Sequence, residues 1–341
     1  MLNKKKWLVL SILFVAISLI AFSLTDLKAA ELPKAVSIGT HPKGSSFNAI
    51  GSGIAKVISL HTRISAVDRP FAGYTKWLPL LNKGEVDMGI VGNVDCYHAR
   101  QGLTPFKDKH PNLRMISSGT DVKLGYFVRA DSGIKTMADF KGKRVIIDPM
   151  GAGMGGIQRV MIKAAGLDLK KDLTAIPVAG VTEAVDALID GRADAAYASV
   201  GMGKVKEAMQ KVGSIYWVPV SGSADDAAAK IIKKELNGVD IKYYKSGSIP
   251  TLNNDAWLIA YPINLVTHAK FSEEATYIIT KAISENQKEL SPIHPFLRGW
   301  VELMVSTNIV LPYHPGAIRL YKEAGKWSDE VDQINQKLLG R

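Results

Sequence analysis

The polar and apolar residues of this chain form a pattern in which short apolar runs alternate with amphipathic segments. The short runs predict buried strands, at residues 35–39, 63–67, 88–91, 113–118, 125–128, 144–147, 193–199 and 256–260. Between them, apolar residues recur every three or four positions, which predicts helices over residues 47–60, 75–82, 157–165, 182–189, 272–290, 298–305 and 316–325. Strands that alternate with helices are typical of an α/β chain with mainly parallel sheets.

Two parts of the chain repeat one construction. LLNKGEVDMGIVG at residues 80–92 matches ALIDGRADAAYAS at residues 187–199, and in each a helix ends with glycine before an aspartate opens the next strand. Two explanations of this match are open. Similar residues could occur independently wherever a helix ends and a strand begins, or the chain could have two lobes of similar construction. On the second interpretation we predict a two-lobed fold, with lobe 1 at residues 30–124 and 254–341 and lobe 2 at residues 125–253.

The stretch at residues 143–167 reads as a strand, a glycine loop and a helix. Gly151, Gly153 and Gly156 satisfy G-x-G-x-x-G, in which glycines let backbone N–H groups approach an anion at a helix N-terminus. A dinucleotide site also needs an acidic residue at the end of a second strand, but Asp168 lies in a loop directly after the first helix. The loop is therefore predicted to bind an anion other than a dinucleotide.

The N-terminus has the features of a secretory signal peptide. Three lysines at positions 4–6 precede an uncharged apolar run over residues 7–24, and small residues follow up to Ala30. We predict cleavage after Ala29. An uncleaved membrane anchor is the alternative, because the apolar run is just long enough to span a bilayer. On either interpretation the rest of the chain is exported and periplasmic.

Composition narrows the possible functions. Removing residues 1–29 takes away four lysines and one aspartate, which lowers the formal charge from +11 to +8. The remaining lysines are spread along the chain, and an exported protein rarely meets nucleic acid, so no nucleic-acid partner is expected. The single cysteine, Cys96, excludes an internal disulfide.

Catalytic and metal-binding patterns are missing from the sequence. The seven histidines are scattered without an H-x-x-x-H pair, so no metal site is predicted. No G-x-S-x-G motif and no G-x-x-x-x-G-K-[ST] loop occur. We therefore expect no cofactor and no enzyme activity. Two lobes that direct helix N-termini into one cleft could instead hold a small solute, since unpaired N–H groups and the helix dipole favour a carboxylate.

Several segments resemble one family, the TAXI-type solute receptors of TRAP (tripartite ATP-independent periplasmic) transporters, which have the type II periplasmic-binding-protein fold. The resemblance covers residues 33–327 and rests on IGT and GSSFNAIG at 38–40 and 44–51, GEVD and NVDCY at 84–87 and 93–97, VRADSGIK and DFKGKRV at 128–135 and 139–145, and LPYHPGA at 311–317. It implies that a solute binds between the lobes and passes to a TRAP membrane permease driven by an ion gradient. Family ligands are amino acids such as glutamate and related carboxylates.

The resemblance also implies ligand-binding residues. Ser46 and Phe47 match the family's Thr-Tyr, Asn48 stands at a second tyrosine, and Asn93 and Asp95 match Ser-Asp after the third strand. For Phe47, packing on the helix is the alternative role, and for Asp95 it is helix capping.

The glycine loop departs from the family pattern. Where the family has Gly-Ser-Gly-Thr, this chain has Gly151, Ala152, Gly153 and Met154, so two hydroxyls are missing. We hypothesise a carboxylate ligand with a more apolar body than glutamate. Alternatively, backbone N–H groups of Gly153 and Gly155 carry the binding and the changed side chains have little effect.

Four further positions complete the predicted site. Ser45 is expected at the helix start of the first loop, where it or Ser46 would be the N-cap. Ser199 ends the matching strand of lobe 2 after Tyr197, and Thr251 and Leu252 lie near the return crossing between lobes. Tyr197 could instead point into the core. A chemosensory receptor of the same fold is the alternative function.

Overall fold

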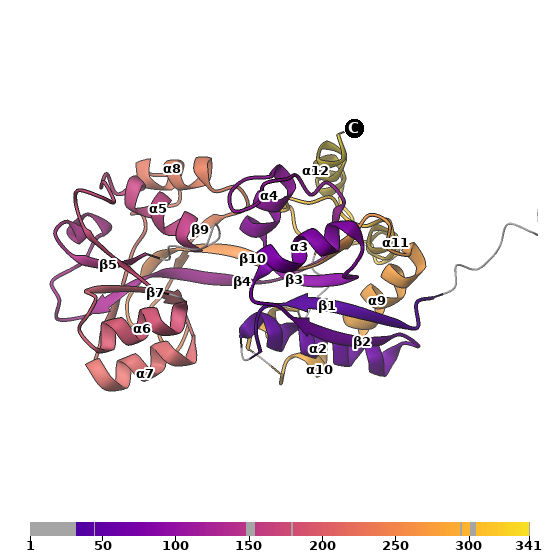
Figure 1. Ribbon diagram of the computed structural model, residues 1–341, viewed down its shortest axis with the longest axis horizontal. Coiled ribbons are helices and arrows are strands. Elements are labelled where there is room, and N and C mark those ends of the chain that lie inside the picture. Colours follow the sequence, from indigo (N-terminus) through magenta and orange to yellow (C-terminus); the bar gives the residue numbers. More distant parts are fainter. Residues whose placement is uncertain are drawn as a thin grey trace, which may run out of the picture. The chain divides into compact units, whose positions relative to one another are not determined.

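The computed structural model (Figure 1) describes residues 32–43, 45–147, 154–178, 180–293, 295–300 and 305–340. Its strands join one hydrogen-bonded sheet in the order β2-β1-β3-β10-β4-β7-β5-β6, while β8 pairs with β4 and β9 pairs with β10. The strands are β1 (Ala35–Thr40), β2 (Ser65–Pro70), β3 (Met88–Gly92), β4 (Leu113–Arg129), β5 (Arg144–Ile147), β6 (Thr174–Pro177), β7 (Ala195–Ser199), β8 (Ile215–Val218), β9 (Asp240–Tyr244) and β10 (Ala256–His268).

Helices connect most of the strands. They are α2 (Ser46–His61), α3 (Tyr74–Lys83), α4 (Asn93–Gln101), α5 (Met154–Ala164), α6 (Val181–Ile189), α7 (Gly203–Val212), α8 (Ala227–Glu235), α9 (Glu273–Glu285), α10 (Gln287–Leu290), α11 (Pro315–Glu323) and α12 (Asp329–Leu339), with 3-10 turns η1 (Met137–Phe140) and η2 (Pro295–Trp300). Of these, α2, α3, α5, α6, α9 and α11 lie where the amphipathic pattern predicts a helix. No helix of the described part is long and apolar enough to cross a membrane. The predicted signal peptide, residues 1–29, lies outside the described residues.

Two groups of parallel strands meet on a pair of long antiparallel strands. β1 pairs in parallel with β2 and β3, and β5 pairs in parallel with β6 and β7. β10 runs antiparallel to β3 through residues 263–267, and β4 runs antiparallel to β7 through residues 124–128. The two parallel groups therefore attach to different parts of the β4–β10 pair (Figure 1).

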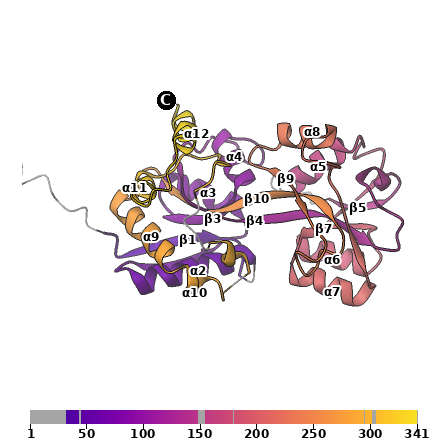
Figure 2. The same ribbon diagram turned by 180° about the vertical axis from the view of Figure 1, so that it is seen from behind.

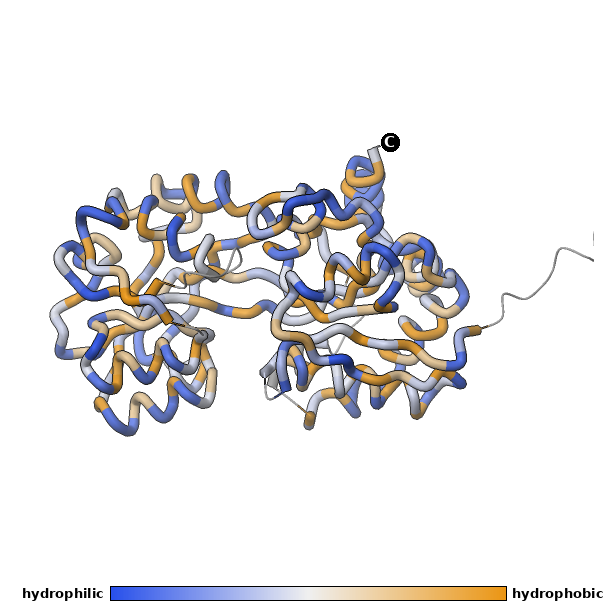
Figure 3. Tube along the Cα trace, in the orientation of Figure 1, coloured by the Kyte–Doolittle hydropathy of each residue, from blue (hydrophilic) through white to orange (hydrophobic). Residues whose placement is uncertain are grey.

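Each parallel group has its own hydrophobic cluster. Trp77, Cys96 and Tyr321 belong to a cluster that packs on β3, and Phe127 and Trp217 belong to another beside β7. Along the tube in Figure 3, hydrophobic and hydrophilic residues alternate through most helices, as expected for helices with one buried face. Two clusters agree with the predicted two-lobed construction. The lobe boundaries stay a prediction: the first falls inside β4, and the second lies two residues before β10.

The long strands correct two predictions. Residues 113–118 and 125–128 belong to one strand, β4, and the strand predicted at 256–260 continues to His268 as β10. Pro262 lies within this continuation, although proline cannot donate a ladder hydrogen bond. In the structure the register of β10 on β4 shifts between Pro262 and Asn264, and this irregularity accommodates the proline. The pattern also missed β6, β8, β9, α7 and α8.

Local signals at helix ends are confirmed. Ser45 is the N-cap of α2, and α3 ends at Gly84, whose φ of 85° lies in the left-handed region that favours glycine. Gly316 at the start of α11 has a packing role: a Cβ there would lie 2.1 Å from the carbonyl oxygen of Glu273. α9 and α11 lie side by side in both views (Figures 1 and 2), so this glycine permits their close approach.

Candidate functional site

The loop from β1 to α2 places an aromatic pair beside the helix N-terminus. Ser45 Oγ accepts a hydrogen bond from the Asn48 backbone N–H at 3.1 Å, which begins α2. The Phe47 ring stacks on the His41 ring with centroids 4.6 Å apart and an interplanar angle of 13°. Both residues are half-buried, and the His41 Nε2 atom is fully buried. Burial lowers the pKa of His41 to about 4, which keeps this imidazole neutral at physiological pH.

Asn48 links this loop to the neighbouring strand. Its Nδ2 donates to Thr40 Oγ1 at 3.1 Å and to Asp68 Oδ2 at 2.7 Å, and the side chain is buried. The predicted ligand residue therefore has protein partners that fix its orientation. Ser46, the first residue of α2, is half-buried beside it.

The first turn of α4 holds a carboxylate that lacks a full set of partners. Asp95 is only 7% exposed, and its Oδ1 has no hydrogen-bond partner among the described residues. Burial raises the pKa of Asp95 to about 7, and a hydrogen bond with the Tyr74 side chain opposes that rise. A carboxylate in this position is costly to ionise, because a buried charge needs an opposite charge or hydrogen-bond donors.

Tyr261, from β10, lies next to this carboxylate. A Cβ added to Gly92 would come within 2.7 Å of Tyr261 Cε2 and 3.5 Å of Asp95 Oδ2, so the glycine leaves room for both groups. Burial raises the pKa of Tyr261, and the nearby Asp95, Tyr197 and Tyr74 side chains raise it further.

Tyr197 brings the second parallel group into this site. Its ring packs edge-on against Tyr126 at 5.1 Å, and its buried hydroxyl has no hydrogen-bond partner among the described residues. His41 contacts Tyr74, since their ring centroids lie 6.0 Å apart. The buried His41 Nε2 also lacks a hydrogen-bond partner within the described part. We call His41, Tyr74, Asp95, Tyr197 and Tyr261 the Asp95 cluster.

Asn93 belongs to a separate polar network. Its Oδ1 accepts from Asn264 Nδ2 at 2.7 Å, and its Nδ2 donates to the Asn308 carbonyl at 2.8 Å. Asn264 Oδ1 in turn accepts from Ser118 Oγ at 2.8 Å. With the side chain wholly buried, this geometry gives Asn93 a structural role that needs no solute.

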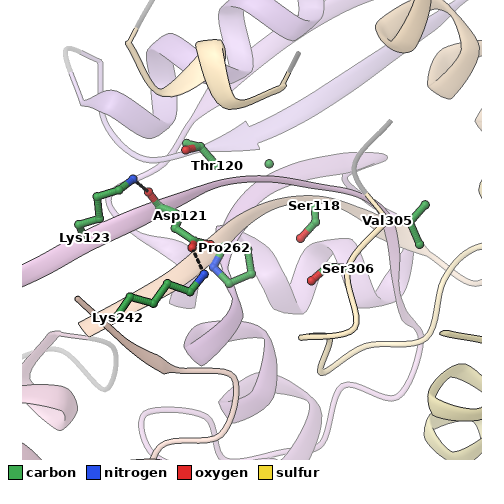
Figure 4. A pocket seen from close by; sticks show the side chains of 9 residues that line it. Ser118, Thr120, Asp121, Lys123, Lys242, Pro262, Val305 and Ser306 are labelled. Carbon is green, nitrogen blue, oxygen red and sulfur yellow. Dashed lines mark hydrogen bonds and ion pairs between the residues drawn. The ribbon is translucent and has the colours of Figure 1, made fainter. Parts of the chain in front are cut away.

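A cavity of about 370 Å³ lies beside β4, β9 and β10 (Figure 4). Its lining includes Ser118, Asp121, Lys123, Lys242 and Pro262. Lys242 Nζ lies 2.5 Å from Asp121 Oδ2, and Lys123 Nζ donates to the Asp121 carbonyl at 2.9 Å. These polar groups already have protein partners, so the cavity offers a solute fewer unpaired hydrogen-bonding groups than the Asp95 cluster does. No group of metal-ligating side chains occurs in the described ranges.

Comparison with known proteins identifies the family. A model of the NMT1-like family matches residues 38–325. The chain belongs to the NMT1-like family. Among solved structures, this NMT1-like chain is similar to PhnD1 from Prochlorococcus marinus in complex with methylphosphonate, with 14% identity over 86% of this chain and 100% of that chain and a TM-score of 0.53. It is also similar to a TctC solute binding protein from Polaromonas, with 17% identity over 90% of this chain and 99% of that chain and a TM-score of 0.50.

These similarities establish the fold. The expected α/β, two-lobed periplasmic-binding-protein fold is confirmed for this NMT1-like chain. Within it, the predicted residues divide into two sets. Asp95 and Phe47 lie in or against the Asp95 cluster. Thr251 Oγ1 instead accepts from the Gly201 backbone N–H at 2.8 Å, and Leu252 is buried in the cluster beside β7.

The remaining predicted residues come from lobe 2. Ser199 ends β7 half-buried, with its Oγ 3.5 Å from the Val200 carbonyl. Gly151, Ala152 and Gly153 lie outside the described residues. Of Met154 only the backbone is described, as the first residue of α5, and Gly155 follows in a buried position.

Sequence reasoning missed three members of the Asp95 cluster. His41, Tyr74 and Tyr261 stand in different segments and follow no spacing that signals a shared site. A turn-rich loop directly after β1 was the available signal for His41. Tyr261 gave no signal, because it follows the point where the strand was predicted to end.

Proposed function

We propose that this NMT1-like protein is an extracytoplasmic receptor that binds a small solute at the Asp95 cluster. The observation that carries the proposal is a set of three buried polar atoms, Asp95 Oδ1, His41 Nε2 and the Tyr197 hydroxyl oxygen, that lack partners among the described residues. Each such group costs about 1–3 kcal/mol of stability. A bound solute would remove that cost by supplying hydrogen bonds.

The fold supports this proposal. One solved protein of the same fold is a solute-binding protein, and another was solved in complex with methylphosphonate. In open α/β folds, ligands bind outside the carboxyl ends of parallel strands. His41 follows β1 and Asp95 follows β3, so both stand at such ends, and Tyr197 is contributed by β7 from the other parallel group.

The proposal extends to the transport system. We infer a TAXI-type receptor that hands a small carboxylate or amino-acid-like solute to a TRAP membrane permease, because two of the segments shared with that family supply Phe47 and Asp95. Residues 1–29 would direct export as a signal peptide.

The test begins with the exported protein. Mature protein is isolated gently from the periplasm, and solute released on denaturation is identified by mass spectrometry. We expect one small solute that raises the melting temperature when it is added back to stripped protein. If no solute is retained, and none of a panel of amino acids and organic acids shifts the melting temperature, the receptor proposal is refuted.

A matched pair of variants locates the site. Tyr197→Phe removes only the partnerless hydroxyl, whereas Tyr243→Phe removes a hydroxyl from a tyrosine that is 44% exposed. We expect Tyr197→Phe to weaken solute binding several-fold without loss of stability, and Tyr243→Phe to bind like the wild type. Equal affinity of both variants would place the solute elsewhere.

A further inference from the structure

The Asp95 carboxylate is surrounded by groups that are neutral at physiological pH. Tyr74 from α3 hydrogen-bonds it, Tyr261 lies against it from β10, and the Cys96 thiol follows it in α4. Burial raises the pKa of both Tyr261 and Cys96, so neither carries a charge near pH 7. No lysine or arginine of the described residues acts on the Asp95 carboxylate.

Asp95 is linked to three half-buried aromatic residues. Tyr74 hydrogen-bonds it, the His41 ring lies 6.0 Å from the Tyr74 ring, and Phe47 stacks on His41, whereas Asp95 itself is 7% exposed. Its partnerless Oδ1 is an acceptor, which calls for a donor on the solute. Once Asp95 is ionised, a solute carboxylate would meet a like charge, and a solute ether or carbonyl group would offer the carboxylate oxygen no donor.

On this basis, and resting on the receptor function proposed above, we propose that Asp95 binds a cationic N–H group of the solute in exchange for a proton. The class of solute is an organic cation with at least one N–H bond, such as an ammonium, amidinium or guanidinium group. The O–H bond of the protonated carboxyl breaks, its proton leaves to bulk water, and the carboxylate accepts an N–H hydrogen bond. The solute nitrogen keeps its own protons, so the charge balances.

The exchange has a defined pH dependence. Ligand-free Asp95 has a pKa of about 7, and a cation bound to it favours the ionised form and lowers that pKa. Below pH 7 each binding event therefore releases up to about one proton, and the dissociation constant rises about tenfold for each pH unit of acidification. Near pH 8 the carboxyl is already ionised, and release falls towards zero.

Calorimetry with the retained solute tests the exchange. Titrations at pH 6 and pH 8, each in two buffers of different ionisation enthalpy, count the protons released. We expect a solute that contains a cationic N–H group, close to one proton released at pH 6, and much less at pH 8. Asp95→Asn should weaken binding by at least about tenfold and abolish the release, since a charge-assisted hydrogen bond is lost.

Asp131→Asn is the matched control, because this carboxylate is exposed and paired with Arg129. It should bind and release protons like the wild type. A retained solute without a cationic nitrogen overturns the inference, as does proton uptake at pH 6. Wild-type affinity in Asp95→Asn overturns it too, and in all three cases the receptor function stands. If no solute is found, the receptor proposal itself fails.

Discussion

Asp95 makes the stability of the ligand-free protein depend on pH. Its pKa is about 7 in the folded chain against 3.8 for an unperturbed aspartate, a rise of about three units. A carboxyl with a raised folded-state pKa costs nothing while both states are protonated, below the unfolded value. The cost then grows through the interval between the two pKa values and is complete above about pH 7.

The magnitude follows from the size of the rise. One pKa unit corresponds to 1.36 kcal/mol, so ionised Asp95 costs up to about 4 kcal/mol at pH 8. Asparagine has nearly the same shape and carries no charge. We therefore expect Asp95→Asn to raise the free energy of unfolding of solute-free protein by about 1–4 kcal/mol at pH 8, and by less than about half of that amount at pH 5.

The assay is urea unfolding of stripped protein at pH 5 and pH 8, followed by fluorescence. Asp131→Asn serves as the control for removing a carboxylate, since that side chain is exposed and its change should not favour pH 8 in the same way. If Asp95→Asn destabilised the protein equally at both pH values, Asp95 would be ionised and paired in the folded state. The reasoning about its burial would then be wrong.

Three further predictions concern packing and the site. Gly316→Ala should lower the free energy of unfolding by about 3 kcal/mol in a urea titration, because the new Cβ would lie 2.1 Å from the Glu273 carbonyl oxygen. Gly203→Ala is the control and should change this free energy little, because there is open space around Gly203. Asn93→Ala should cost about 2–4 kcal/mol, since it strips buried hydrogen bonds from two neighbouring asparagines, and an unchanged unfolding midpoint would contradict the network. His41, with a pKa of about 4, should stay neutral down to pH 5 in an NMR titration; an inflection near pH 6.5 would show that the ring is exposed.

Part of the fold follows directly from local sequence. The apolar run at residues 144–147 gives β5 with the same bounds, and Ser45 caps the helix that its position predicts. Gly84 ends α3 for an equally local reason, because only glycine adopts its positive φ without strain. These features depend on a few consecutive residues, so the sequence alone reveals them.

The length of β10 required the tertiary structure. Pro262 reads locally as the end of a strand, but pairing with β3 on one side and β4 on the other continues to His268. Hydrogen bonds to two neighbouring strands outweigh the missing proline donor. No local pattern carries that information.

The site shows the same division. The family resemblance predicted ligand-binding roles for both Asn93 and Asp95, since both follow the third strand. In the structure, Asn93 hydrogen-bonds to Asn264, whereas Asp95 Oδ1 has no hydrogen-bond partner among the described residues. Tyr261 reaches Asp95 from β10, far along the chain, only because the sheet places β10 next to β3. The sequence by itself determined which residues are polar and where α2 begins and α3 ends, whereas the sheet order decided which polar atoms find partners, because hydrogen bonding depends on distances in space.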